Sequence, residues 1–271
     1  MITPTHVVWP TRHEIFGTRV SATNYREVVE AVLKAAEAGQ PAMVDFMSAH
    51  GLTTAARDPA YRRRLNDFDI LAPDGQPVRW ALNHFHEAGL SDRVYGPELM
   101  RRLCKSAAER GVSIYLYGSS QKVIEALSRR LLEWFPKLII AGAESPPFRP
   151  LIAEEDAEAV ARINRSGAKL LFIGISSPKQ EVFAHEHRNR IRPVQLCVGA
   201  AFDFHAGTKR MAPPWMQRRG MEWLFRLTQE PGRLWKRYLV VNTTYLLLFA
   251  TEALRRRFNR TFGRVGRPAL R

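Results

Sequence analysis

The sequence predicts an α/β fold in which helices cover both faces of a parallel sheet. Short β-rich apolar runs alternate with helical apolar stripes, and the links between them are short. The chain has 271 residues, 45% of them hydrophobic and 25% charged, which is enough for a large buried core. We expect an N-terminal β-hairpin before this sheet and a C-terminal helical appendage after it.

The elements follow in chain order. Alternating apolar residues around Pro10 and Gly17 predict a β-hairpin over residues 7–20. Asn24 and Glu27 resemble a capping box at the start of a helix that runs to about Ala36. Strands are expected over 42–47, 69–72, 112–117, 138–141, 170–174 and 194–198. Helices are expected up to about 66, and over 78–85, 97–110, 121–135, 154–166 and 180–191.

We divide the chain into three parts. Residues 1–207 form the α/β domain. Residues 208–260 form a basic amphipathic helical appendage, and residues 261–271 are expected to be a disordered tail. The hinge runs from Gly207 to Pro214, and a new element should begin near Trp215 because Pro213 and Pro214 block helix before it.

The charge is concentrated in the appendage. The net charge is +15, and the chain from Lys209 onward holds 15 Lys/Arg against 3 Asp/Glu. Such a block indicates a polyanion, either nucleic acid or an anionic membrane surface. A helical apolar stripe favours lipid: Leu234, Tyr238, Val241, Tyr245 and Leu248. The alternative is a helix packed on the body. We expect these residues at the membrane: Trp215, Arg218, Arg219, Trp223, Arg226, Arg233, Lys236 and Arg237.

The rest of the composition points to the cytoplasm. Cys104 and Cys197 lie in apolar contexts and predict buried thiols. The N-terminus does not look like a signal peptide, and there is no run of about 18 apolar residues that could span a bilayer. The histidines lack metal-ligand spacing, and the Asp67-Phe68-Asp69 segment precedes a strand, at the wrong end of the sheet for a site. No metal is therefore expected.

Ligands of parallel sheets bind beyond the carboxyl ends of the strands, so the residues that follow each strand are candidates. Asp74 follows the strand at 69–72. It is either a turn aspartate or a general base whose pKa is raised by burial or a like charge. His50 follows the strand at 42–47 and is the one histidine worth testing. Asp203, between Phe202 and Phe204, is either structural or a substrate contact.

Two further loops could hold phosphate. Ser177 as N-cap, Pro178 at the first position and Gln180 as capping-box partner predict a helix start. Its free amides, helped by Lys179, would attract an anion, although the segment could also be a cap alone. Gly118 and Ser119 begin a second candidate phosphate loop, which lacks the full Walker or dinucleotide spacing.

Five motifs occur in order along the chain. They are Pro73-Asp-Gly75, Arg93-Val-x-Gly96, Gly174-x-Ser-Ser-Pro-Lys-Gln-Glu181, Val198-Gly-Ala-x-Phe-Asp-Phe-x-Ala-Gly207 and Arg210-x-Ala-Pro-x-Trp-Met-Gln-x-x-Gly-x-Glu-Trp223. Together they resemble the WecG/TagA/CpsF family of bacterial glycosyltransferases, also called glycosyltransferase family 26, from about Ile15 to Leu248.

The resemblance implies a Rossmann-like domain and an inverting, metal-independent transfer that needs no cofactor besides its donor. The donor would be a UDP-sugar and the acceptor a saccharide on polyprenyl diphosphate. By resemblance Asp74 is the catalytic base, Arg93 and Gln180 lie near the donor, and the appendage docks on the membrane. Phe46 and Ser48 stand where the family commonly has Thr-x-Asn. The donor sugar could therefore be N-acetylmannosamine, its uronate, glucose or glucuronate.

The sequence therefore predicts a cytoplasmic glycosyltransferase, peripheral on the inner face of the bacterial plasma membrane, that serves surface or exopolysaccharide synthesis. Its partners would be the UDP-sugar, the lipid-linked acceptor and the anionic membrane. Nucleic acid is not among them, and a homo-oligomer is left open. Two other hypotheses about the function remain. One is a nucleic-acid-binding protein that uses the basic tail, and the other is a non-catalytic UDP-binding module.

Overall fold

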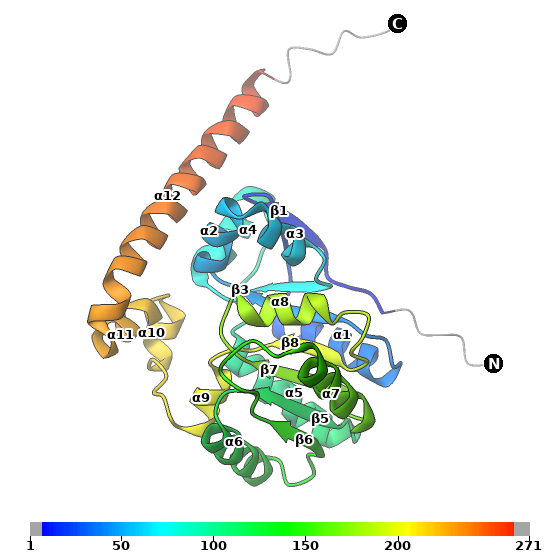
Figure 1. Ribbon diagram of the computed structural model, residues 1–271. Helices are drawn as coiled ribbons and strands as arrows, with labels where there is room; N and C mark the ends of the chain where they lie inside the picture. Colours follow the sequence, from blue (N-terminus) through cyan, green and yellow to red (C-terminus); the bar gives the residue numbers. More distant parts are fainter. Residues whose placement is uncertain (1–6, 263–271) are drawn as a thin grey trace, which may run out of the picture.

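The computed structural model describes residues 7–262, which form a six-stranded parallel sheet between two layers of helices, preceded by a two-stranded hairpin (Figure 1). The strands are β1 (Arg12–Ile15), β2 (Thr18–Ser21), β3 (Met43–Met47), β4 (Ile70–Pro73), β5 (Ile114–Gly118), β6 (Ile140–Glu144), β7 (Leu170–Gly174) and β8 (Val194–Cys197). The order in the large sheet is β4-β3-β8-β7-β5-β6. The predicted α/β class is confirmed.

Twelve helices lie within the described residues. They are α1 (Tyr25–Glu37), α2 (Ala49–Arg57), α3 (Pro59–Asn66), α4 (Gln76–His86), α5 (Gly96–Arg110), α6 (Gln121–Trp134), α7 (Ala153–Arg165), α8 (Lys179–Glu186), α9 (Ala201–Ala206), α10 (Pro214–Arg218), α11 (Glu222–Gln229) and α12 (Pro231–Phe262). None of the described helices combines the length and the apolar character that crossing a membrane requires.

The core has two halves, one on each face of the sheet. Along β7, Leu170 and Phe172 belong to the cluster that includes α1, α5, α6 and α9. Leu171 and Ile173 belong to the cluster on the opposite face, which includes α2, α3, α4, α7 and α8. Both faces are covered, and this explains why the strand is apolar throughout instead of alternating with polar residues.

Local signals account for several element ends. The Asn24 side chain accepts a hydrogen bond from the Glu27 amide at 3.1 Å, which confirms the predicted cap of α1. The hairpin turn is Phe16-Gly17, and both residues have positive φ, as tight two-residue hairpin turns require. The hairpin is confirmed, although its strands are shorter than the expected span. Cys104 and Cys197 are free and buried.

The appendage begins where α9 ends. Gly207 closes α9 with φ +78°, and α10 begins at Pro214, close to the expected start near Trp215. Helix α12 packs against α2, and its C-terminal part projects away from the body (Figure 1). It continues as helix to Phe262, so the helix enters the segment expected to be disordered. The remainder of that segment, 263–271, lies outside the described residues.

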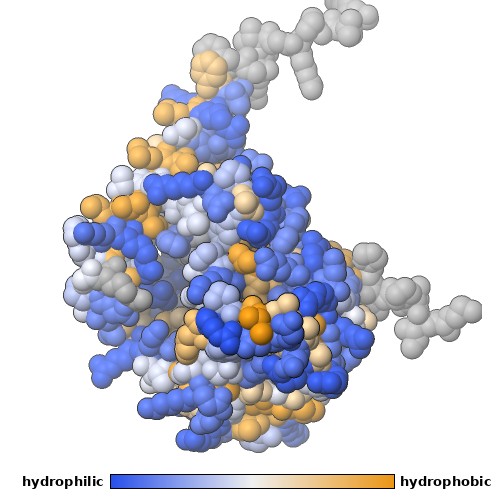
Figure 2. All heavy atoms as spheres, viewed as in Figure 1, coloured by the Kyte–Doolittle hydropathy of each residue, from blue (hydrophilic) through white to orange (hydrophobic). Residues whose placement is uncertain are grey.

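The apolar stripe that the sequence singled out on α12 faces the protein body. Leu234 and Tyr245 are buried, and the Tyr245 hydroxyl donates to the Pro77 carbonyl at 2.6 Å. A second apolar stripe faces outward and consists of Leu239, Val240, Leu246, Leu247, Leu254 and Phe258. Figure 2 shows hydrophobic side chains along this projecting helix. Any apolar contact with a membrane would therefore use the second stripe, because the body already covers the first.

Candidate active site

Asp74 follows β4 directly, at the carboxyl edge of the sheet. Its amide donates to the Met47 carbonyl at 3.0 Å, which fixes the turn against the end of β3. The residue is partly exposed, but its Oδ1 atom is buried and has no hydrogen-bond partner among the described residues. Burial raises the pKa of Asp74 to about 6, while the nearby positive charge of Arg93 acts in the opposite direction. Such a carboxylate suits a base near neutral pH.

The structure brings Arg93 to Asp74. The Val94 amide donates to the Pro73 carbonyl at 2.9 Å, so the segment before α5 is tied to the end of β4. The Arg93 Nη1 atom donates to the Asp74 carbonyl at 3.2 Å, and the guanidinium also pairs with Glu222 of α11. The expected proximity of Asp74 and Arg93 is therefore present.

Gln180 lies in the first turn of α8 and is buried. Its Nε2 atom donates to the Cys197 carbonyl at 3.2 Å, at the end of β8, and its Oε1 atom has no partner among the described residues. Gly199 passes so close that a Cβ there would lie 3.3 Å from this oxygen. Gln180 thus offers a free, enclosed acceptor at the same edge of the sheet as Asp74.

Asp45 and Glu181 are two buried carboxyl groups beside Gln180. Asp45 lies on β3, and its pKa is raised well above the ordinary value by burial and by the charge of Glu181. Burial also raises the pKa of Glu181. The charge of Asp74 also raises the pKa of Asp45. Asp45 is therefore near both Asp74 and Glu181, which lies in the first turn of α8.

The predicted cap of α8 is wrong. Pro178, and not Ser177, is the N-cap residue, and no side chain caps the first-turn amides. The Ser177 side chain lies near Tyr61 and Glu181, where it acts to lower the pKa of both groups against the larger effect of burial. Lys179 is exposed at the first position of the helix, which ends at Glu186 and not near Ile191.

The Gly118-Ser119 loop lies beside the end of β7. Gly118 has φ +138°, and a Cβ there would lie 2.5 Å from the Gly174 carbonyl carbon, so only glycine fits. Ser119 also has positive φ, and its carbonyl accepts from the Ser145 hydroxyl at 2.7 Å. The close packing of the two loops keeps this candidate phosphate loop at the carboxyl edge.

Two candidates have contacts elsewhere. Asp203 accepts from the Thr208 hydroxyl at 3.2 Å and lies 3.7 Å from Lys209 Nζ, contacts that hold the Gly207 turn. His50 lies in the first turn of α2, where partial burial of its ring and, to a smaller extent, the charge of Arg237 on α12 lower its pKa. Neither side chain forms a hydrogen bond or ion pair with Asp74 within residues 7–262.

Helix α11 covers the Asp74 loop. Besides Glu222 it contributes Arg226, whose guanidinium lies 5.6 Å from the Phe204 ring and acts electrostatically on Tyr95 and Asp74. The Gln76 Nε2 atom donates to the Arg218 carbonyl at 3.3 Å, which ties α10 to the start of α4. Within the described residues, no group of three or more His, Cys, Asp or Glu could hold a metal ion.

The similarity of the chain to a known protein family identifies the family to which it belongs. Residues 13–259 match the model of the glycosyl transferase WecG/TagA/CpsF family, which is nearly the whole chain. The chain belongs to this family.

Two characterised relatives of this WecG/TagA/CpsF member come from Bacillus. Both are named N-acetylglucosaminyldiphosphoundecaprenol N-acetyl-β-D-mannosaminyltransferase. The protein from Bacillus subtilis is 28% identical over 207 residues, which cover 75% of this chain and 77% of the relative. The protein from Bacillus spizizenii is 28% identical over 188 residues, which cover 69% and 70%.

Several residues at the site of this WecG/TagA/CpsF protein were not predicted. They are Asp45, Tyr95 and Glu222. Glu222 lies within a quoted motif and could have been considered, but nothing local indicates its partner 129 residues away. Arg226 was predicted as a membrane residue and lies over the Asp74 loop. The side chain of Arg233, another membrane candidate, lies outside the described residues, whereas Trp215 and Trp223 are exposed.

Phe46 and Ser48, which depart from the WecG/TagA/CpsF pattern, both have structural contacts. The Ser48 hydroxyl caps α2 by accepting from the Gly51 amide at 3.1 Å. The Phe46 ring lies 3.4 Å from the position that a Cβ at Gly96 would take, and the Gly96 amide acts to lower the pKa of Asp74. Phe46 therefore forms an apolar, partly exposed surface beside the carboxylate.

Proposed function

We propose that this protein transfers a hexose from a UDP-sugar to a saccharide carried on polyprenyl diphosphate, with inversion and without a metal. The observation that carries the proposal is Asp74, a carboxyl group with a pKa of about 6, held at a strand end beside Arg93. A general base must be deprotonated at working pH yet basic enough to take a proton, and a pKa near 6 satisfies both conditions.

The reaction follows from these groups. The Asp74 carboxylate takes the proton from an acceptor hydroxyl, and that oxygen forms a bond to the anomeric carbon of the donor. The bond between the anomeric carbon and the UDP oxygen breaks on the opposite face, and UDP leaves with its electron pair. Arg93 and the start of α8 near Ser177 and Lys179 would hold the diphosphate. The free Oε1 atom of Gln180 would accept a hydrogen bond from a sugar hydroxyl.

The names of the Bacillus relatives support the choice of acceptor. Both act on N-acetylglucosaminyl-diphosphoundecaprenol and transfer N-acetylmannosamine. For this chain we propose the same acceptor class. We keep N-acetylmannosamine, its uronate, glucose and glucuronate as candidate donor sugars, because Phe46 places an apolar ring where a hydrogen-bonding residue is usual.

A lipid-linked acceptor requires the enzyme to reach a membrane. The outward apolar stripe of α12, together with the basic residues around it, supports peripheral binding to an anionic membrane, on the cytoplasmic face. This stripe also favours lipid over nucleic acid, because phosphate contacts to nucleic acid need cations but no exposed leucines.

A donor screen tests the proposal. The wild-type protein is incubated with each UDP-hexose and a synthetic polyprenyl-diphosphate N-acetylglucosamine. The mass of the lipid product is then measured by mass spectrometry. We expect one donor to add a single hexose and release UDP without added metal, also in the presence of a chelator. No product from any UDP-sugar would reject the proposed function.

A further inference from the structure

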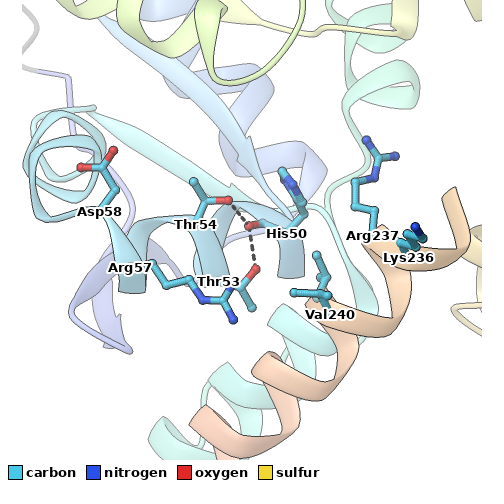
Figure 3. A pocket seen from close by; sticks show the side chains of 9 residues that line it. His50, Thr53, Thr54, Arg57, Asp58, Lys236, Arg237 and Val240 are labelled. Atoms are coloured by element: carbon cyan, nitrogen blue, oxygen red, sulfur yellow. Dashed lines mark hydrogen bonds between the residues drawn. The ribbon is translucent and has the colours of Figure 1, made fainter. Parts of the chain in front are cut away.

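A groove between α2 and α12 has no assigned role. It encloses about 510 Å³ and takes lining residues from both helices. His50 and Arg57 come from α2, and Lys236, Arg237 and Val240 come from α12 (Figure 3). The groove thus joins the body to the appendage.

The groove is positively charged. Among the described residues, Arg57, Lys236 and Arg237 form no ion pair with a carboxylate. In the part of the chain that the structure describes, the Arg57 guanidinium donates to the Thr244 hydroxyl, a neutral group. Lys236 and Arg237 lie over the neighbouring rings of Trp235 and Tyr238. The groove therefore holds cations whose charge is not neutralised by the protein.

The one acid of the groove is already engaged. The Oδ1 atom of Asp58 accepts from the amides of Ala60 and Tyr61, at 2.9 and 3.0 Å, where it caps α3. In Figure 3 this carboxylate points away from Arg237 and Lys236. Asp58 therefore does not neutralise the cations on α12, and the groove is suited to an anion.

One end of the groove adjoins the candidate active site. His50 lies in the first turn of α2, directly after β3. A Cβ at Gly75 would lie 3.7 Å from the Ala49 amide nitrogen, so the loop that holds Asp74 touches this turn. An anion bound near His50 and Arg237 would therefore be close to the base.

The α12 wall of the groove also carries apolar side chains, Val240 and Val241. Val240 lines the groove, is 49% exposed, and also belongs to the outward apolar stripe of α12. A ligand could thus place its charge between the two helices and continue as hydrocarbon along α12. This combination fits a phosphate joined to a lipid chain better than it fits a free nucleotide.

We propose that this groove binds the diphosphate of the polyprenyl-diphosphate acceptor, with the first isoprene units against Val240. The inference rests on the proposed function and adds the place where the acceptor is held. Arg57 and Arg237, from opposite walls, would clamp the diphosphate by charge-assisted hydrogen bonds. The sugar would then lie toward Asp74 and the lipid toward the membrane.

Calorimetric titration of the full chain with farnesyl diphosphate, a soluble polyprenyl diphosphate, tests this proposal without any transfer reaction. Inorganic pyrophosphate and farnesol serve as partial ligands. Arg237→Gln removes a groove cation that forms no side-chain hydrogen bond within residues 7–262, and Arg57→Gln removes one from the other wall. Arg165→Gln, an exposed arginine at the end of α7, is the matched control. Thermal unfolding of each variant shows whether it is folded.

We expect farnesyl diphosphate to bind more tightly than pyrophosphate or farnesol. Each groove variant should weaken binding about tenfold and the control should not. Flotation with phosphatidylcholine vesicles that carry either undecaprenyl diphosphate or phosphatidylglycerol at equal charge separates the two phosphate sources. Equal loss with both lipids, or unchanged binding of farnesyl diphosphate by both variants, would overturn the proposal. Failure of every UDP-sugar in the donor screen would leave this binding result intact.

Discussion

Arg93, at the end of the loop before α5, forms an ion pair with Glu222 of α11, with both side chains largely buried. This pair connects the α/β domain to the appendage directly over Asp74, whose carbonyl accepts from the same guanidinium. Burial acts to lower the pKa of Arg93, but the hydrogen bond with Glu222 and the charges of Asp74 and Glu222 outweigh it and raise the pKa, so this guanidinium stays protonated. The appendage thus engages the arginine that we assign to the donor diphosphate.

Glu222→Gln should tighten UDP binding several-fold, because the donor diphosphate would no longer have to displace a carboxylate from Arg93. The same change should lower the free energy of unfolding by about 1–3 kcal/mol, since a buried guanidinium loses its charged partner. Titration with UDP and chemical denaturation measure the two effects.

Glu98→Gln is the control for this prediction. Glu98 pairs with Arg101 and Arg102 on the surface of α5, where an ion pair contributes little. It should change neither quantity by much. UDP binding that weakens in Glu222→Gln would show that Glu222 positions Arg93 for the donor instead of competing with it.

The pH dependence of kcat/KM should show the ionisation of Asp74. Because the base acts as a carboxylate and its pKa is about 6, kcat/KM should rise with pH through about 6 and then level off. Initial rates across pH 4.5–8, an interval of about two units around that value, measure this. A kcat/KM that stays constant down to about pH 4.5 would mean that the base has an ordinary carboxyl pKa, which burial does not raise.

The same pKa predicts a stability effect. The folded pKa lies above the ordinary value of 3.8, so folded protein binds more protons than unfolded protein between about pH 4 and 6. The contribution of Asp74 to stability is therefore fully present below pH 4 and is lost as pH rises through 6. Asp74→Asn should gain stability relative to wild type across that window. Denaturation curves in which the difference is independent of pH would refute the shift.

The outward stripe of α12 should be needed for membrane binding. Leu246→Glu and Leu247→Glu place charges on side chains that are 67% and 64% exposed, so they should leave the free energy of unfolding within about 0.5 kcal/mol of wild type. Both should reduce flotation with anionic vesicles at least several-fold. Leu132→Glu, at an exposed position of α6, is the control and should float as wild type does. Wild-type flotation of both α12 variants would show that the outward stripe does not contribute to membrane binding.

Gly118→Ala should be severely destabilising. Its Cβ would clash with the Gly174 backbone at a φ of +138°, and neither backbone can easily give way. We expect a loss of about 3 kcal/mol or more in denaturant unfolding. Gly89→Ala is the control, because Gly89 also has positive φ but a Cβ there would meet no atom within 4 Å. It should lower the free energy of unfolding by about 1 kcal/mol. Similar losses for the two variants would show that the close packing of the loops does not matter.

The sheet could be predicted because each strand carries its own signal. Residues 170–174 form a short apolar run that ends in glycine, and β7 has those limits. Asp74 could be proposed as a site residue for a related reason, since its position at a strand end follows from the order of elements. Arg93 and Gln180 needed the resemblance to known motifs, because nothing in their local sequence indicates a ligand.

The parts that failed depend on contacts between distant residues. Ser177 has the local signature of an N-cap, but its side chain lies near Tyr61 of α3, which is distant in sequence, and the N-cap of α8 is Pro178. The helix predicted to reach Ile191 ends earlier, where His187 contacts Asp156 at 2.7 Å. On α12 two apolar stripes recur at helical spacing, and only packing against α2 and α4 decides which of them is covered.

If Asp74 is the base of a glycosyl transfer, its replacement should stop transfer and spare UDP binding, and a comparison of Asp74→Asn with wild type measures both. Transfer to the lipid-linked acceptor is followed with the active donor, and UDP binding is titrated in the same preparations. We expect transfer to fall by at least about a hundredfold while UDP affinity stays within about threefold of wild type. Transfer at the wild-type rate in the Asn variant would contradict it.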